Sequence, residues 1–256
     1  MHYQVLKNVI FIAIFLFIAH QLTAQINSKI GLSSYLKGNE FYEQKRYKEA
    51  INLFSQAIDS MNSANPKPIA ELVKSHNNRG NAYGQIANLL LALFDYDKAI
   101  ELDKKLVESY LNRANIHTLL RNFTKAIADL NKAIQLNPKF YEAYYQRGLI
   151  LLLDIHQNLD AAKDLKLAAE KLKTAQAITY YAQCLQELNN YTEALAQTNK
   201  AIAVDKKYAE IYYIRAIIFR SQKDKVKALA EIEKALEIAA DTPEYKDLKI
   251  EITKIK

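Results

Sequence analysis

The segment NNRGNAYG, residues 77–84, carries residue types that could bind a phosphate group: two glycines, an arginine and small polar neighbours. Glycine-rich loops bind phosphate through backbone N–H groups where a strand leads into a helix. Here the same frame returns three more times, with arginine again followed by glycine or alanine. These pairs are Arg79-Gly80, Arg113-Ala114, Arg147-Gly148 and Arg215-Ala216. A phosphate loop would occur once, so we interpret the frame as part of a repeated helix.

Other residues typical of catalysis or metal binding are few. His76, His117 and His156 lie 41 and 39 residues apart, without the spacing of paired metal ligands. Cys184 is the single cysteine, which excludes an intramolecular disulfide, and its apolar neighbours predict a small buried side chain. No GxSxG, P-loop or Cys/His arrangement is present. We therefore expect no catalytic activity, no cofactor and no bound metal.

The composition predicts a folded, helical protein. Of 256 residues, 50% are hydrophobic and 25% are charged, whereas only 5 are Gly and 4 are Pro. Ala, Leu, Ile, Lys and Glu dominate, and all but Ile are strong helix formers. The formal charge of +7 could indicate a nucleic acid or a membrane surface. The lysines are scattered among acidic residues, however, so we expect a solvated surface and no nucleic-acid partner.

Residues 1–24 have the pattern of a secretory signal peptide. Lys7 precedes an apolar run from Val9 to Ala19. As a helix this run would be about 16 Å long, too short for a comfortable membrane span. We predict cleavage after Ala24, a linker at 25–33 and no membrane span in the mature chain. The alternative is an uncleaved N-terminal anchor.

The residues around the predicted cleavage site also indicate a location. No cysteine lies near Ala24, which excludes a bacterial lipid anchor. The ending TAQ resembles signal peptides common in Bacteroidota. That resemblance implies export to the periplasm or cell envelope of a bacterium.

Alanine pairs seven residues apart recur along the remaining chain. The first alanines follow one another at intervals of 42, 34, 35, 33 and 34 residues. A small residue precedes the first alanine by 12 residues in five units and by 13 in the fourth. The pairs are Ala50/Ala57, Ala92/Ala99, Ala126/Ala133, Ala161/Ala168, Ala194/Ala201 and Ala228/Ala235. The small residues are Gly38, Gly80, Ala114, Gly148, Ala182 and Ala216.

This spacing predicts two antiparallel helices in each unit. Seven residues are about two helical turns, so the paired alanines share one stripe of the second helix. We expect the small residue of the first helix to meet that stripe. One helix pair cannot bury its apolar face alone, so consecutive pairs must stack. The sequence therefore predicts an all-α stacked array.

The repeat pattern resembles the tetratricopeptide repeat family over residues 34–240. The segment FTKAIADLNKAIQLNP is close to the family consensus, although no tryptophan occurs in the chain. The resemblance implies a right-handed superhelical α-solenoid of about six helix–turn–helix repeats. Residues 241–256 are expected to form a C-terminal capping helix that begins at Thr242-Pro243. Departures are eight extra residues before the second unit and an irregular turn near LLLDIHQNLDAA.

Members of this family bind partners on a concave face lined by the first helix of each repeat. Asparagine amides at those positions can hold a peptide backbone without reading its side chains, whereas tyrosines can hold an apolar anchor. The resemblance therefore implies a non-catalytic scaffold for a protein or peptide partner. The matching groove positions are Tyr35, Asn39, Asn77, Asn78, Asn81, Asn112, Asn115, Tyr145, Gln183 and Tyr213.

Several alternatives stay open or are disfavoured. One family variant clamps a C-terminal carboxylate with cations. The matching positions here hold no cation, so capture of a chaperone tail is disfavoured. They are Tyr35, Asn39, Asn78, Glu108 and Asn112. The groove positions could equally be solvated or covered by the protein's own N-terminal segment. A structural subunit of an envelope complex, using convex or edge surfaces, is the second reading. RNA binding is disfavoured because no lysine-lined groove is present.

Overall fold

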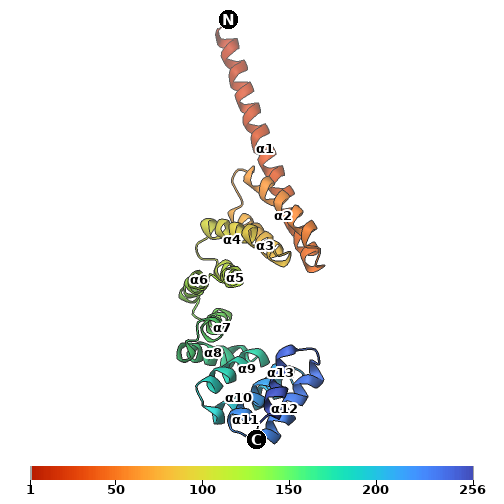
Figure 1. Cartoon of the computed structure of the whole chain (residues 1–256). Coiled ribbons are helices and arrows are strands. Elements are labelled where there is room, and N and C mark those ends of the chain that lie inside the picture. The colour runs from red at the N-terminus through yellow and green to blue at the C-terminus, as the bar shows by residue number, and fades with distance from the viewer. Residues whose placement is uncertain (1, 256) are drawn as a thin grey trace. The chain divides into compact units, whose positions relative to one another are not determined.

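The computed structural model describes residues 2–255, with side chains from residue 10 onward, and every regular element in that range is helical (Figure 1). The predicted all-α class is confirmed. The chain divides into two compact units, unit 1 at Met1–Arg121 and unit 2 at Asn122–Lys256. In chain order the described helices alternate between the first and the second helix of a repeat, and α13 follows as the last helix.

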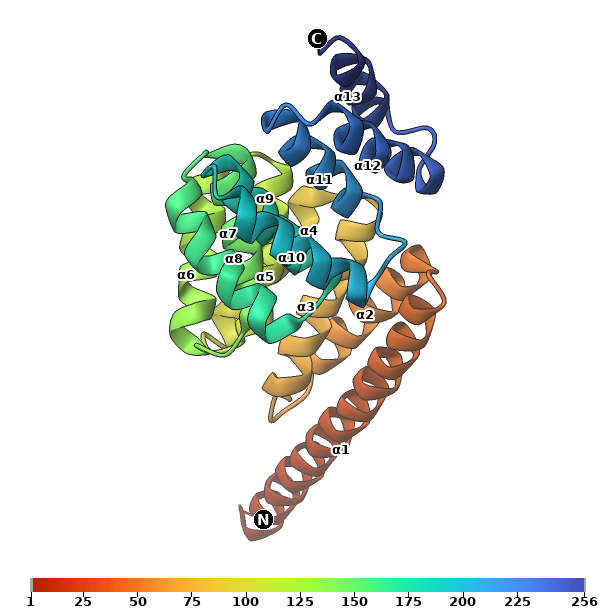
Figure 2. The same cartoon turned by 90° about the horizontal axis from the view of Figure 1, so that it is seen from below.

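Unit 1 contains five helices, of which α1 and α2 pack against each other and α3 packs against both α2 and α4 (Figures 1 and 2). They are α1 (His2–Glu43), α2 (Tyr47–Asn62), α3 (Ile69–Gln85), α4 (Leu89–Leu102) and α5 (Val107–Leu119).

Unit 2 continues the alternation of first and second helices, and α13 packs on α12 and α11 at the C-terminal end. Its elements are α6 (Phe123–Leu136), α7 (Tyr141–Leu149), the π-helix η1 (Ile150–Asp154), α8 (Asn158–Leu172), α9 (Ala175–Glu187), α10 (Tyr191–Val204), α11 (Glu210–Ser221), α12 (Lys225–Ile238) and α13 (Pro243–Thr253).

The paired alanines lie where the helices approach each other. All twelve have 0% of their surface exposed, as the seven-residue spacing predicts. The small residue of the first helix meets this stripe as expected, through the side chain that lies between the two alanines. A Cβ added to Gly38 would lie 2.6 Å from Cε1 of Phe54, and one added to Gly80 would lie 2.8 Å from Cε1 of Tyr96.

At Gly38, Gly80 and Gly148 the small residue of the first helix therefore faces a larger side chain that lies four residues after the first alanine. This residue stands between the two alanines on the same stripe of the second helix. Its bulk fills the space that the small residue and the two alanines leave, in the manner of a knob in a hole. The residues at this position are Phe54, Tyr96, Leu130, Leu165, Thr198 and Ile232, all buried.

The irregular turn expected in the fourth repeat is a short π-helix at the end of α7. The backbone N–H of Ile155 donates to the carbonyl of Ile150 at 3.1 Å, an i→i+5 bond. A π-turn holds one residue more than an α-turn. The extra residue between Gly148 and Ala161 is thus absorbed inside the first helix, and the alanine stripe keeps its register.

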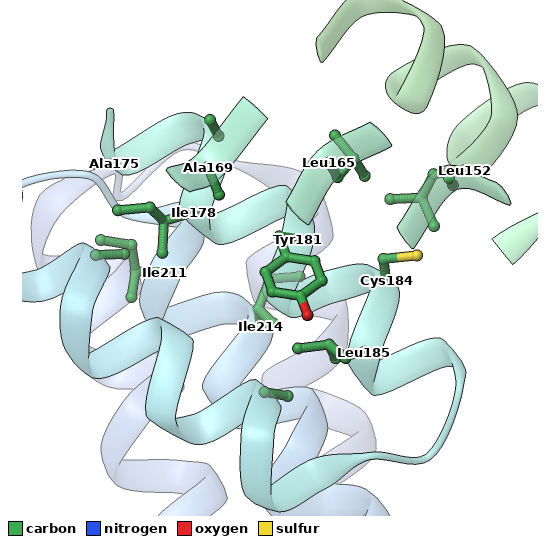
Figure 3. Packing of buried hydrophobic residues seen from close by; sticks show 14 of the residues in the cluster. Leu152, Leu165, Ala169, Ala175, Ile178, Tyr181, Cys184, Leu185, Ile211 and Ile214 are labelled. Atoms are coloured by element: carbon green, nitrogen blue, oxygen red, sulfur yellow. The ribbon is translucent and has the colours of Figure 1, made fainter. Parts of the chain in front are cut away.

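The core of unit 2 is built from buried side chains of α8, α9 and α11 (Figure 3). Cys184 lies in this core on α9, and its Sγ is 3.0 Å from the backbone carbonyl of Asn158. Burial raises the pKa of the Cys184 thiol to about 11. The prediction of a small buried residue at this position is confirmed.

Helix α1 runs without a break through the predicted cleavage site at Ala24, which is only 3% exposed. Residues 25–33, expected as a linker, are helical here. A Cβ added to Gly31 would lie 2.6 Å from Cγ of Met61, so this segment packs closely along α2. By contrast, the apolar side chains from Ile10 to Leu22 are exposed. The stretch Ile10–Glu43 has the length and composition to cross a membrane, with a mean hydropathy of 1.6 over its most apolar 18 residues.

Candidate functional site

Five asparagines of unit 1 form one hydrogen-bonded chain across three first helices. Asn78 on α3 donates from Nδ2 to Oδ1 of Asn39 on α1 at 2.8 Å, and accepts from Nδ2 of Asn77 at 3.3 Å. Asn112 on α5 donates to Oδ1 of Asn77 at 3.3 Å and to Oδ1 of Asn81 at 3.0 Å. The asparagine row expected from the sequence is therefore an asparagine chain, in which most amides bind a neighbouring amide.

Two hydroxyl groups fix the orientation of the amides in the asparagine chain. Ser109 donates to Oδ1 of Asn77 at 2.9 Å, and Tyr96 donates to Oδ1 of Asn81 at 2.8 Å. Both carbonyl oxygens thus receive two donors each. Nδ2 of Asn81 and Oδ1 of Asn112 take no part in a hydrogen bond among the described residues. These groups can donate to and accept from a peptide backbone.

A hollow of about 310 Å³ lies at one end of the asparagine chain. We call it the unit 1 hollow. Asn115 lines it and makes no side-chain hydrogen bond within the part of the chain that the structure describes. Its polar rim and partly apolar floor suit an extended backbone with one inserted side chain. The lining residues are Tyr42, Asn81, Gly84, Gln85, Tyr96, Asn112, Asn115, Ile116 and Leu119.

Tyr35, another expected groove residue, lies elsewhere. Its ring packs on that of Phe54 with 6.1 Å between the centroids. It also borders the buried cluster around Met61 and Leu72. Tyr35 therefore contributes to the packing of α1 on α2 and does not line the unit 1 hollow.

The remaining expected residues belong to unit 2. Tyr145 on α7 meets Tyr180 on α9 edge to face, with 6.2 Å between the ring centroids. Tyr213 on α11 stacks on Tyr245 of α13 at 4.9 Å. Gln183 is half-buried on α9 and makes no side-chain hydrogen bond among the described residues. The asparagine half and the tyrosine half expected from the sequence thus fall in different units.

The repeated arginine of the first helices forms a fork with an acid of the second helix. Arg79 donates from Nε and Nη2 to both carboxylate oxygens of Asp95, each at 2.8 Å, and from Nη1 to Oγ of Ser55 at 2.9 Å. Nδ1 of His76 lies 2.8 Å from the same Asp95, which has no exposed surface. The charged head of Arg79 therefore ties α3 to both α4 and α2.

The fork recurs in unit 2 with varying geometry. Arg147 donates to the two carboxylate oxygens of Asp164 at 2.7 and 2.8 Å. Arg215 makes a single bond of 3.1 Å to Glu231, which is one methylene longer than aspartate. The arginines therefore stabilise helix pairing and are not available to bind phosphate.

Three family models match the chain, each for the tetratricopeptide repeat, at residues 73–106, 107–140 and 182–243. Together they cover half of the sequence. The chain belongs to the tetratricopeptide repeat family. No curated protein matches it.

Solved tetratricopeptide repeat structures share the fold. YrrB matches with a TM-score of 0.59 and 22% identity over 72% of this chain and 98% of its own. It is described as a tetratricopeptide repeat protein with an unusual peptide-binding site. PilF of Pseudomonas aeruginosa matches with a TM-score of 0.73 and 14% identity over 88% and 99%. A tetratricopeptide repeat protein of Parabacteroides merdae matches with a TM-score of 0.54 and 19% identity over 88% and 99%. Tetratricopeptide repeats indicate a protein–protein interaction scaffold.

Three residues that line the unit 1 hollow, Tyr42, Gln85 and Leu119, were not among the predicted groove positions. Tyr42 lies three residues after Asn39 and Gln85 four residues after Asn81, one turn further along the same helix faces. Leu119 follows Asn115 by four residues. Extending each first helix by one turn would have found all three. The forked acids could have been found from a carboxylate 16 or 17 residues after the arginine.

Proposed function

We propose that this protein is an exported, non-catalytic scaffold that binds an extended segment of a partner protein in the unit 1 hollow. The observation that carries the proposal is the asparagine chain that ends there. Asn81 and Asn112 of this chain, and Asn115 beside it, have unused amide donors or acceptors at the lining of the hollow. YrrB, which shares the fold, is described as having a peptide-binding site.

The chemistry of the hollow favours backbone recognition. Amides pair with the N–H and C=O groups of any peptide, whatever its side chains. Each such bond adds only about 0.5–1.5 kcal/mol net. Two or three bonds and a small apolar contact on Leu119 therefore give weak binding, with a Kd on the order of micromolar.

Amide replacement tests this proposal in a pull-down from envelope extract. We expect the combined change Asn112→Ala and Asn115→Ala to abolish partner capture. The matched control is Asn52→Ala with Asn62→Ala, two exposed asparagines of α2 outside the hollow. Circular dichroism checks that both double variants stay folded. Full capture by a folded Asn112/Asn115 variant would refute the hollow as the binding site.

Export and cleavage after Ala24 are part of the proposal. The exposed apolar side chains from Ile10 to Leu22 and the single early cation Lys7 support it. N-terminal sequencing of the protein from the periplasmic fraction tests it. A mature chain that begins at Gln25 is expected, whereas a chain that keeps residues 1–24 and pellets with membranes supports the anchor alternative.

A structural subunit of a cell-envelope complex is the second candidate function. It is favoured by an apolar surface on α4, where Leu90 is 74%, Leu91 42% and Phe94 52% exposed. Exposed apolar patches of this kind mark protein interfaces. Size-exclusion chromatography with light scattering tests it, since Leu90→Ser with Phe94→Ser should dissociate such an assembly. A monomer before and after the change would exclude this function for the α4 surface.

A further inference from the structure

Glu210, the first residue of α11, carries a carboxylate that is half-buried and faces no cation. Its Oε2 accepts one hydrogen bond, from the hydroxyl of Tyr245 at 2.9 Å. Its Oε1 makes none among the described residues. Burial raises the pKa of Glu210, the hydrogen bond from Tyr245 lowers it, and the nearby carboxylate of Glu244 raises it further. The site therefore holds an uncompensated negative charge.

Five tyrosines of unit 2 form what we call the tyrosine cluster. Tyr245 bonds the carboxylate directly, the charge of Glu210 also acts on Tyr180, Tyr208 and Tyr213, and Tyr145 joins the cluster through its ring contact with Tyr180. Tyr213 and Tyr245 stack at 4.9 Å, and Tyr145 meets Tyr180 edge to face at 6.2 Å. The hydroxyl of Tyr208 lies against that of Tyr180. Burial raises the pKa of Tyr180, Tyr208, Tyr213 and Tyr245, and the charge of Glu210 raises each of them further.

The aromatic faces add to the negative potential of the carboxylate. A tyrosine ring is negative on its face and attracts a cation within about 6 Å of its centroid. Carboxylate and rings together thus form a receptor for one positive charge. The partial positive charge at the N-terminus of α11 stabilises the Glu210 carboxylate, but only by about 0.3–1 kcal/mol.

Two cations of α11 and α12, Arg220 and Lys225, have other partners. Arg220, on the same helix, forms an ion pair with Glu251 of α13. Lys225 donates to the backbone carbonyls of Thr253 and Ile255, each at 2.7 Å. Neither is therefore available to neutralise Glu210.

We propose that Glu210 and the tyrosine cluster bind the side-chain cation of a lysine or arginine in a partner segment. The inference rests on the proposed scaffold function and deepens it, because it assigns a charge to the partner. Glu210 supplies the ionic contact through Oε1, and the half-buried rings of Tyr180, Tyr208 and Tyr213 pack on the methylenes and the charged head. The hydrogen bond from Tyr245 holds the carboxylate in place.

A titration of the full chain with a minimal probe tests the proposal. The tyrosine rings are labelled with ¹³C and observed by NMR while Nα-acetyl-lysine methylamide is added at constant ionic strength. The uncharged control is Nα-acetyl-norleucine methylamide, which has the same aliphatic chain. We expect saturable shifts of the Tyr180, Tyr208 and Tyr213 rings with the lysine probe only, assigned from single Tyr→Phe variants.

Matched variants separate charge from structure. Glu210→Gln keeps an acceptor for Tyr245 but removes the charge, and should weaken the lysine probe about tenfold or more. Glu237→Gln, a change at an exposed carboxylate of α12, should leave it unchanged. Tyr180→Phe keeps the aromatic face and should still bind the lysine probe, whereas Tyr180→Leu should not bind it. Equal shifts with norleucine, no shifts at all, or full affinity in Glu210→Gln would overturn the proposal.

The outcome is independent of the unit 1 hollow. The probe has no extended backbone, and the readout comes only from rings of unit 2. Loss of partner capture with an intact lysine response in the Asn112/Asn115 variant would uphold both sites. A failed lysine titration would leave the proposed hollow unaffected and remove only the cation site.

Discussion

The strongest energetic prediction concerns Asp95, which has no exposed surface and receives two bonds from Arg79 and one contact from His76. Asp95→Asn leaves one acceptor oxygen and turns an NH₂ group toward the guanidinium. The side chain of Arg79 is only 15% exposed, so its charge loses its partner in a place where water cannot replace it. Breaking a buried pair in this way costs about 3–5 kcal/mol of the free energy of unfolding.

The matched control lies two residues away. Asp97 is 60% exposed and pairs with Arg113 at 2.6 Å. Its change to asparagine should cost about 0–1 kcal/mol, because the Asp97 carboxylate is largely in water and Arg113 keeps its contact with the ring of Tyr110. Urea denaturation followed by circular dichroism measures both variants, and hydrogen exchange should locate the loss in α3 and α4.

A second variant tests the mechanism. If the penalty comes from an uncompensated cation, adding Arg79→Met to Asp95→Asn should recover part of the lost stability. A double variant no more stable than Asp95→Asn, or equal costs at Asp95 and Asp97, would refute the reasoning.

Three further predictions follow from burial. Gly80→Ala should destabilise the protein by about 1–3 kcal/mol, because the added Cβ would lie 2.8 Å from Tyr96. Gly84→Ala has room for its Cβ and should stabilise the helix by up to about 1 kcal/mol. Thermal unfolding compares the two variants, and equal effects would contradict the close approach of Tyr96 to Gly80. Since burial raises the pKa of Glu210, this group lowers stability as the pH rises through that raised pKa. Glu210→Gln should therefore be neutral below about pH 4 and stabilising at pH 7; a less stable variant at pH 7 would argue against an uncompensated carboxylate. Cys184, whose pKa burial raises to about 11, should react with a disulfide reagent only at the rate of unfolding; fast labelling of the native protein would contradict its burial.

The alanine stripe was predictable because its spacing depends on helix geometry alone. A seven-residue interval puts two methyl groups on one face whatever lies opposite, and all twelve are buried. The partner of Gly38 was not predictable in the same way. Whether a small residue meets an alanine or the bulky Phe54 depends on the axial offset between two helices, which local periodicity does not determine.

The asparagine positions were predictable, but their bonding was not. Counting along the first helices placed Asn39, Asn78 and Asn112 on one surface. The direction of each amide depends on how far apart successive helices lie, and on hydroxyls such as that of Tyr96 that arrive from a second helix. The sequence therefore indicates which amides face the groove, whereas the structure determines which of their atoms are unused.

The unbroken α1 has a consequence for the export that we propose. A peptidase that binds its substrate as an extended segment requires the residues on either side of Ala24 to leave the helix. In the folded chain Ala24 is 3% exposed and the following turns pack on α2. Under the proposed export, cleavage after Ala24 would therefore precede the folding of the first repeat, and a chain that folds early would keep its apolar segment. The speed of folding relative to translocation would then decide whether the scaffold is released or stays bound to the membrane.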